Sequence, residues 1–354
     1  MQKTNQEMKM IYFVSAITCI GILLVHVLNM FSSEASITAF PYELDQPGVA
    51  MLAVIVGMVF VILERSVGYD RKRFYQVGFV KIVLPFVGMS ILYLAITKIV
   101  MEVSVFTGWK THILDFVMGN SFYHLYFVAA VLQLYLVFPL FQLVRTKMGW
   151  TILLIISFVV NAYFLFLYSP DAANTVAQIF GQKAILVKWI FFFVFGVFLA
   201  QHGELVQAIS KKLNWGGYVS FVGLMCFVVY DIQATEAVGS NSWTVMITIP
   251  LITVSLLAMY DSVKKVILLD LFLTGIGKNV FGVYLIFPLV LFVTSTVLPG
   301  AMFRMEYFVL VFAIVLGTSV FINKAMTLYT GKDGAEKDPV SHPYTMKTKE
   351  LSVN

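Results

Sequence analysis

The feature of this sequence that most constrains its fold is a series of long apolar runs that hold almost no charged residues. A helix of about 20 residues, at 1.5 Å rise per residue, spans the roughly 30 Å hydrocarbon core of a bilayer. Backbone amides in lipid must pair within their own segment, so these runs are predicted helices, and the alternation typical of a β-barrel is absent. The sequence therefore predicts an all-α, polytopic integral membrane protein.

Composition supports the same fold class. Of the 354 residues, 60% are hydrophobic and 12% are charged, whereas soluble domains average about 25% charged residues. A water-soluble fold of this size cannot bury so much apolar surface, but a bilayer solvates it. Ten spans are predicted, at residues 10–31, 47–63, 79–100, 122–143, 150–168, 185–200, 217–233, 244–260, 279–298 and 307–328.

Domain organisation follows from these spans. No soluble domain fits between them, so residues 1–330 are expected to form one transmembrane domain. Residues 331–354 are polar and are predicted to be a disordered cytoplasmic tail. Segment 47–63 is short for a span, and segment 267–277 is a candidate interfacial helix.

Basic residues predict the orientation of the protein. With the N-terminus placed in the cytoplasm, 19 of the 24 lysine and arginine residues fall on the inner side. Cytoplasmic loops carry such an excess, and ten spans return the C-terminus to the same side. We therefore expect a multi-pass protein of the cell membrane with both termini cytoplasmic. The net charge of +5 is mostly a topology signal, and nucleic acid is not an expected partner.

Several catalytic classes leave no signature in the chain. It has no Walker loop, no dinucleotide fingerprint after a strand and no Cys/His metal spacing, which argues against an ATP-driven pump or a metalloenzyme. Cys19 and Cys226 both lie inside apolar runs and are predicted to be small core residues rather than a disulfide. Neither a metal nor a bound cofactor is expected.

His26 is the first candidate for chemistry. It follows Met10 by sixteen residues, or about 24 Å along a helix, which places it near the outer end of the first span. An ionisable side chain this deep in apolar sequence is a functional candidate by default. The alternative is a structural histidine hydrogen-bonded at a helix interface, and chemistry alone favours neither.

His124 is the second candidate, at the predicted outer end of the fourth span. Its neighbours Tyr123 and Tyr126 also fit an aromatic belt at the membrane interface, which is the alternative interpretation. Histidines beside carboxylates on one side of a membrane suit general base chemistry. The outer loops supply further ionisable residues: Glu43, Asp45, His112 and Asp115.

The inner loop after the second span is dense in basic residues. It contains Arg71, Lys72 and Arg73, with Lys81 further along. These charges can be explained as topology signals alone. The functional interpretation is a site for a phosphorylated cytoplasmic donor, because arginine clamps phosphate bidentately and lysine adds a point charge.

Five parts of the chain together resemble a known family, the integral membrane acyltransferase family 3. They are the apolar run ending in His26, residues 71–93, residues 124–140, residues 192–198 and residues 281–288. The resemblance implies a ten-span enzyme that O-acylates cell-envelope polysaccharides. In length and general character the chain is similar to the branch that modifies exopolysaccharides, which includes the intercellular-adhesion polysaccharide O-succinyltransferases.

Two positions depart from the pattern of this family. Many relatives have a histidine before the proline of the ninth span, where this chain has Phe287. Many also have an Arg-x-x-Arg pair just before the third span, where this chain has Arg71, Arg73 and Lys81. His26 matches the histidine of the family's first span.

The resemblance implies a mechanism. Acyl-CoA would be the donor substrate on the cytoplasmic side, and a saccharide hydroxyl outside would be the acceptor. His26 is the candidate base, with Asp45 a candidate to orient it and His124 the next candidate. The donor phosphates would rest on Arg71, Lys72 and Arg73. Direct transfer and a covalent acyl-histidine both remain open.

Two other function classes fit the same sequence. One is an exporter or flippase for a polysaccharide or a lipid-linked sugar, although the scarcity of charges inside the spans argues mildly against an ion-coupled carrier. The other is a non-catalytic scaffold within a polysaccharide synthase complex, whose subunits would then be partners. Glycan analysis of cells with and without the gene discriminates these classes from an enzyme.

Overall fold

The structure is a computed structural model. It describes residues 2–32, 46–68, 70–100, 109–171, 174–213, 215–234, 243–301 and 304–329. Within these residues the chain is helical and contains no strand, which confirms the all-α prediction. The predicted tail, 331–354, lies outside the described residues.

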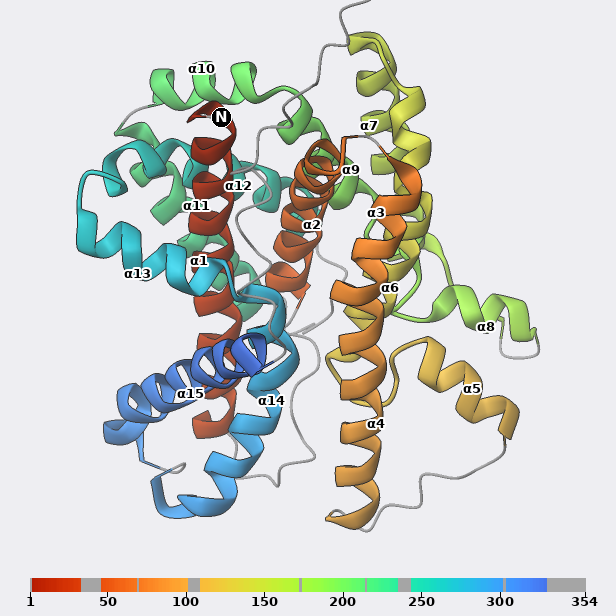
Figure 1. Ribbon diagram of the computed structural model, residues 1–354, viewed down its shortest axis with the longest axis vertical. Coiled ribbons are helices and arrows are strands. Elements are labelled where there is room, and N and C mark those ends of the chain that lie inside the picture. Colours follow the sequence, from red (N-terminus) through yellow and green to blue (C-terminus); the bar gives the residue numbers. More distant parts are fainter. Residues whose placement is uncertain are drawn as a thin grey trace, which may run out of the picture.

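The described helices follow one another along the chain (Figure 1). In the first half they are α1 (Gln2–Ser32), α2 (Gln46–Ser66), α3 (Arg71–Gly78), η1 (Phe79–Val83), α4 (Leu84–Ile99), α5 (Trp109–Val117), α6 (Leu125–Val137), η2 (Phe138–Leu143), α7 (Lys147–Ala162) and η3 (Tyr163–Leu167). In the second half they are α8 (Thr175–Gly181), η4 (Leu186–Lys188), α9 (Ile190–Gln201), α10 (Gly203–Leu213), α11 (Gly216–Ala234), α12 (Trp243–Val263), α13 (Ile267–Gly277), α14 (Val280–Val297), η5 (Pro299–Ala301), η6 (Met305–Tyr307) and α15 (Phe308–Tyr329).

Eight helices in the described residues are long and apolar enough to cross a membrane. Two of the predicted spans, 122–143 and 217–233, correspond instead to the shorter apolar stretches Leu125–Phe141 and Gly216–Val228. The predicted spans therefore all lie on helices, and the protein is a polytopic membrane protein.

Three predicted boundaries were wrong. Segment 47–63, which looked short, belongs to the 20-residue stretch Pro47–Ser66. The third span begins at Arg71 rather than at 79, because α3, η1 and α4 form one continuous helical stretch, Arg71–Ile99. The fourth helix begins at Leu125, so His124 lies at its N-terminal boundary rather than inside it.

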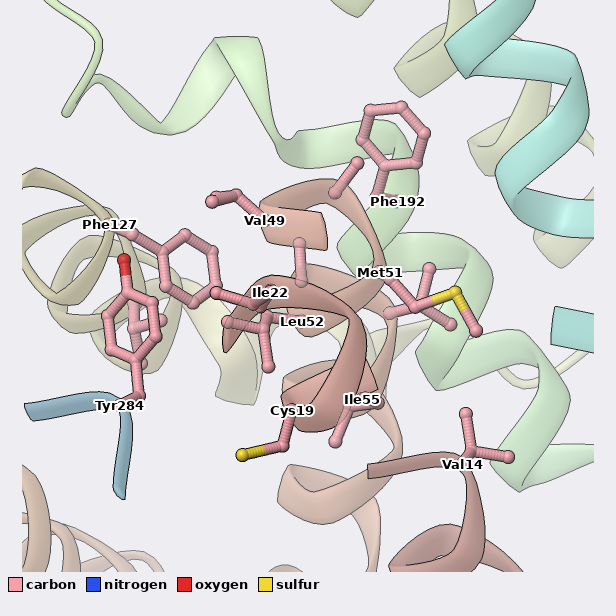
Figure 2. Packing of buried hydrophobic residues seen from close by; sticks show 14 of the residues in the cluster. Val14, Cys19, Ile22, Val49, Met51, Leu52, Ile55, Phe127, Phe192 and Tyr284 are labelled. Atoms are coloured by element: carbon pink, nitrogen blue, oxygen red, sulfur yellow. The ribbon is translucent and has the colours of Figure 1, made fainter. Parts of the chain in front are cut away.

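Part of the core lies where α2 packs against both α1 and α9. Figure 2 shows Cys19 and Ile22 of α1 beside Leu52 and Ile55 of α2. Gly196 of α9 lies directly against the backbone of α2, and a Cβ at this position would collide with the Val54 carbonyl. Small residues allow this close approach of membrane helices, where van der Waals packing drives association.

Apolar side chains cover much of the outer surface, as expected for helices that face lipid. Exposed examples include Ile91 on α4, Ile155 on α7 and Val309 on α15. Cys226 is also exposed on α11, so the prediction of a core position holds for Cys19 but is wrong for Cys226. An outward-facing thiol costs little when the solvent is lipid.

Helix α13 runs across α1 rather than along it (Figure 1). One face carries Asp270, which lies 3.5 Å from the ammonium group of Lys9 on α1. The opposite face exposes apolar side chains, with Leu268 81% exposed. The polar face of α13 thus contacts α1 and its apolar face points outward, and the interfacial helix expected at 267–277 stays a prediction.

Candidate functional site

His26 projects from the end of α1 that lies far from the N-terminus. Nineteen residues separate it from Glu7, which corresponds to about 28 Å of helix. The side chain is 4% exposed. Its ring lies 5.0 Å from that of Phe287 on α14 and 5.7 Å from that of Tyr123, measured between centroids. The structure therefore encloses the first candidate histidine among aromatic rings.

His124 occupies the N-terminal boundary of α6 and is 1% exposed. Its ring lies 5.1 Å from that of Tyr93 on α4 and 5.4 Å from that of Tyr284 on α14. The backbone of Leu285 on α14 is the polar group that interacts with the His124 ring. The second candidate histidine is therefore buried among aromatic rings and the backbone of α14.

The two histidines share neighbours. Phe287 lies 6.0 Å from His124 as well as 5.0 Å from His26. Tyr123 likewise contacts both rings, at 5.4 Å from His124. We call these four residues, His26, Tyr123, His124 and Phe287, the histidine cluster. Sequence could only suggest that the two histidines reach one face, and the fold brings them into one enclosed group.

Two tyrosine hydroxyls fix the backbone around the histidine cluster. Tyr284 donates a hydrogen bond of 2.8 Å to the carbonyl of His124. Tyr93 donates one of the same length to the carbonyl of Leu285. Together these bonds tie α4, α6 and α14 to one another across the site, so the imidazole of His124 is held by elements from distant parts of the chain.

The turn before His124 is also constrained. Gly119 adopts φ +72°, a left-handed conformation that glycine reaches without steric cost, and a Cβ there would collide with the Leu125 carbonyl. The amide of the Asn120 side chain donates to the carboxylate of Asp115 at 3.0 Å. This hydrogen bond links α5 to the turn that precedes His124.

Phe287 of α14 lies between the two histidines. It is fully buried and lies against both His26 and His124. An apolar ring therefore lies at the centre of the cluster. A phenyl group cannot transfer a proton, so any proton chemistry here rests on the remaining two histidines.

The other outer candidates do not join this cluster in the described residues. Glu43 and Asp45 lie outside the described residues. His112 is half-buried on α5, and Asp115 of the same helix accepts the hydrogen bond from Asn120. Asp115 therefore has a structural partner, and the structure gives no position for the carboxylate that was expected to orient His26.

The predicted donor residues lie at the opposite end of the bundle. Arg71, Lys72 and Arg73 are exposed in the first turn of α3. The carboxylate of Asp70 caps this helix and accepts from the backbone amides of Lys72 at 2.9 Å and Arg73 at 3.2 Å. Lys81 follows Arg71 by ten residues, or about 15 Å along the helix, so it does not extend the same group.

The same end contains a cavity of about 430 Å³ that the sequence did not reveal. It lies at the corner between α9 and α10, and its charged lining includes Arg65 of α2 and Lys147 of α7. Arg65 and His202, which line the cavity, were not singled out from the sequence. These residues come from separate segments with no shared motif, so no sequence signal could have grouped them.

Comparison with known proteins identifies the family. The chain matches the family model for the acyltransferase domain of acyltransferase family 3 over residues 14–323. No curated protein and no solved structure gives a significant match. The match covers most of the chain and includes every residue of the histidine cluster. This polytopic membrane protein therefore belongs to acyltransferase family 3.

Proposed function

We propose that this membrane acyltransferase moves an acyl group from acyl-CoA to a hydroxyl group of an extracytoplasmic polysaccharide. The observation that carries the proposal is the histidine cluster, in which two buried imidazoles share an aromatic enclosure within a chain of this family. By the same resemblance, the acceptor is an envelope or secreted exopolysaccharide, and the succinyl group is the acyl group to test first.

His26 is proposed as the general base. A saccharide hydroxyl is a weak nucleophile at neutral pH, and a neutral imidazole can remove its proton as it attacks the thioester carbonyl. The new ester C–O bond forms, the C–S bond breaks, and the CoA sulfur leaves with a proton from the imidazolium. His124 is the second proposed catalytic residue, because it lies in the same cluster and can take or return that proton.

Burial of the histidine cluster supports acyl transfer over hydrolysis. Both imidazoles are more than nine-tenths buried among aromatic rings, so bulk water has little access to the base. Exclusion of water protects a reactive acyl donor from the competing attack of solvent. Asp45 remains a proposed orienting residue for His26.

The proposed orientation puts the N-terminal end of the bundle in the cytoplasm, where CoA is found. Arg71, Lys72 and Arg73 lie exposed at that end and are proposed to attract the donor phosphates. Lys81 is proposed to contribute only more distant charge. The histidine cluster then lies near the outer face, where a polysaccharide acceptor would be reached.

A matched pair of histidine substitutions tests this proposal. The full-length protein is reconstituted in lipid nanodiscs, and acyl transfer from acyl-CoA to a polysaccharide is followed by mass spectrometry of the glycan. We expect His26→Gln to lower turnover at least about 10²-fold, because glutamine retains hydrogen bonding but cannot act as a base. His112→Gln, on the same predicted face but outside the cluster, should retain turnover.

Near-normal turnover of the His26→Gln variant would make His26 a structural residue. If wild-type protein transferred no acyl group to any polysaccharide, and cells lacking the gene kept fully acylated glycans, the enzyme proposal would fail. Intracellular accumulation of glycan in those cells would instead support export.

A further inference from the structure

The turn between α5 and α6 carries two adjacent aromatic residues, Phe122 and Tyr123. Both side chains are half-buried. His124, which follows them, is 1% exposed, and His26 is 4% exposed. Because Phe287 is fully buried as well, Tyr123 is the member of the histidine cluster that solvent partly reaches.

An aromatic stack holds this turn in place. The ring of Phe122 stacks on that of Tyr93, with the centroids 4.3 Å apart and the planes 15° from parallel. The ring of Tyr123 lies 4.9 Å from that of Phe122. Tyr93 is buried in α4 and donates its hydrogen bond to the Leu285 carbonyl. Tyr123 therefore has a fixed support, and a ligand that contacts it loses little free energy in ordering the turn.

The Tyr123 ring lies beside both imidazoles. Its centroid is 5.7 Å from that of His26 and 5.4 Å from that of His124, and the ring planes are inclined at 47° and 63°. A molecule that contacts the solvent-accessible part of Tyr123 is therefore close to the two candidate proton-transfer groups. In the proposed orientation this part of the histidine cluster lies near the outer face, where the acceptor is found.

An aromatic ring at this place is suited to one shape of acceptor. Aromatic faces carry negative charge density, which attracts the weakly positive hydrogens of C–H groups. A pyranose with equatorial hydroxyls has axial C–H groups that form an apolar face on the sugar ring. An open-chain polyol with the same hydroxyls has no such face. Tyr123 can therefore distinguish cyclic from open-chain acceptors without using a charged group.

We propose that Tyr123 is the platform for the acceptor: its ring stacks on one pyranose unit of the polysaccharide and places a hydroxyl of that unit beside the histidine cluster. This inference rests on the proposed function and names the residue that selects the acceptor. Tyr123 binds and orients the sugar ring but transfers no proton. The acceptor class that follows is a polysaccharide of pyranose units rather than a chain of acyclic polyols.

Binding of a neutral oligosaccharide tests the platform directly. Chitotetraose, a β-linked oligosaccharide whose ring substituents are equatorial, is titrated calorimetrically into the full-length protein in phosphatidylcholine nanodiscs without donor. We expect Tyr123→Leu to raise the Kd about fivefold to tenfold, because leucine has no aromatic face. Tyr123→Phe keeps the face and should stay within about twofold of wild type. Tyr163→Leu, at an exposed tyrosine of η3 outside the histidine cluster, is the matched control and should also stay within about twofold.

Acceptor selectivity separates stacking from structural support. Acyl transfer is measured with the methyl β-glycoside of N-acetylglucosamine and with the open-chain alditol N-acetylglucosaminitol. The ratio of kcat/KM for the cyclic over the open-chain acceptor should fall about fivefold in Tyr123→Leu and stay unchanged in Tyr123→Phe. A substitution that merely loosens the histidine cluster, or that leaves part of the protein unfolded, lowers both values together. Their ratio then stays the same, so the comparison does not depend on the folded fraction.

The outcomes separate the platform from the reaction. If chitotetraose binds wild type and Tyr123→Leu equally well, or if the acceptor ratio is unchanged in Tyr123→Leu, the inference is overturned while the proposed reaction stands. If wild type binds no chitotetraose, the inference also fails. If wild type binds chitotetraose more tightly than Tyr123→Leu does, but acylates no acceptor, the platform is supported and the proposed reaction fails.

Discussion

The two ends of this helical bundle hold their polar groups in opposite ways. At the N-terminal end, Arg65 and Lys147 border an open cavity and the basic group of α3 is exposed. At the other end, His26 and His124 are enclosed by aromatic rings and have almost no contact with solvent. Charged side chains thus lie where solvent reaches them, and the two imidazoles lie where it does not.

The two ends differ because burying a charged group costs more free energy than burying a neutral one. An isolated buried ammonium or guanidinium is strongly unfavourable, so fixed cations stay at the rim or in a wet cavity. A neutral imidazole can be buried at much lower cost, although burial disfavours the imidazolium that forms when it takes a proton. Under the proposed function, the N-terminal end would recognise an anionic donor, and the histidine end would perform the chemistry. Substitutions at the two ends should therefore affect different kinetic parameters.

The largest expected effect concerns the second histidine. His124→Gln should lower kcat roughly 10²-fold while leaving the KM for acyl-CoA near its wild-type value, because a general base contributes about 10²–10⁴-fold. The measurement is steady-state acyl transfer by the full-length protein in nanodiscs, with CoA binding determined on the same sample. A change confined to the donor KM would contradict the assignment of chemistry to this end.

Substitution of the exposed basic residues of α3 should give an effect of intermediate size. It should change the donor KM rather than kcat. Replacing Arg71, Lys72 and Arg73 together with Gln should raise the donor KM about threefold to tenfold and leave kcat unchanged, because each exposed charge contributes only about 0.2–1 kcal/mol. The effect should weaken at high ionic strength, where exposed charges are screened.

This triple variant needs a topology control, since the same residues are predicted topology signals. A cysteine introduced at exposed Gln76 of α3, in the wild-type and triple-variant backgrounds, should show the same accessibility to a membrane-impermeant thiol reagent. Unchanged donor KM in correctly inserted protein would reduce the basic group to a topogenic role. Reversed accessibility of Gln76Cys would show that the charges had been setting orientation.

The fold was largely predictable because apolar length is a local signal. The ten predicted spans all coincide with helices, since a run such as that of α1 has no soluble alternative. The errors arose at boundaries. Arg71 looked like a loop residue because of its charge, yet Asp70 caps a helix that begins there and continues to Ile99. The hydrogen bonds from the backbone amides of Lys72 and Arg73 to the Asp70 side chain stabilise a helix where the charged sequence had suggested a loop.

The site was only partly predictable, because it depends on contacts distant in sequence. His26 and His124 were recognisable as ionisable residues in apolar surroundings, but Phe287 between them appeared only as a departure from a family pattern. The cavity between α9 and α10 could not be anticipated, because Arg65 and Lys147 lie far apart in the chain and resemble any other inner-side charges. Their grouping depends on how α2, α7 and α9 pack.

The smallest expected effect is that of removing a hydrogen bond that supports the histidine cluster. Tyr284→Phe removes the hydroxyl that donates to the His124 carbonyl at 2.8 Å but keeps the ring that packs against the imidazole. The lost hydrogen bond should lower the free energy of unfolding by about 1 kcal/mol, with kcat falling only a few-fold as His124 becomes less fixed. Tyr230→Phe, an exposed tyrosine on α11, is the matched control and should change neither quantity. Thermal unfolding in nanodiscs and steady-state turnover measure the two effects. If Tyr284→Phe lowered kcat as much as His124→Gln, the hydroxyl would have to take part in the reaction directly. Tyr284 would then be a third catalytic group at the histidine end of the bundle.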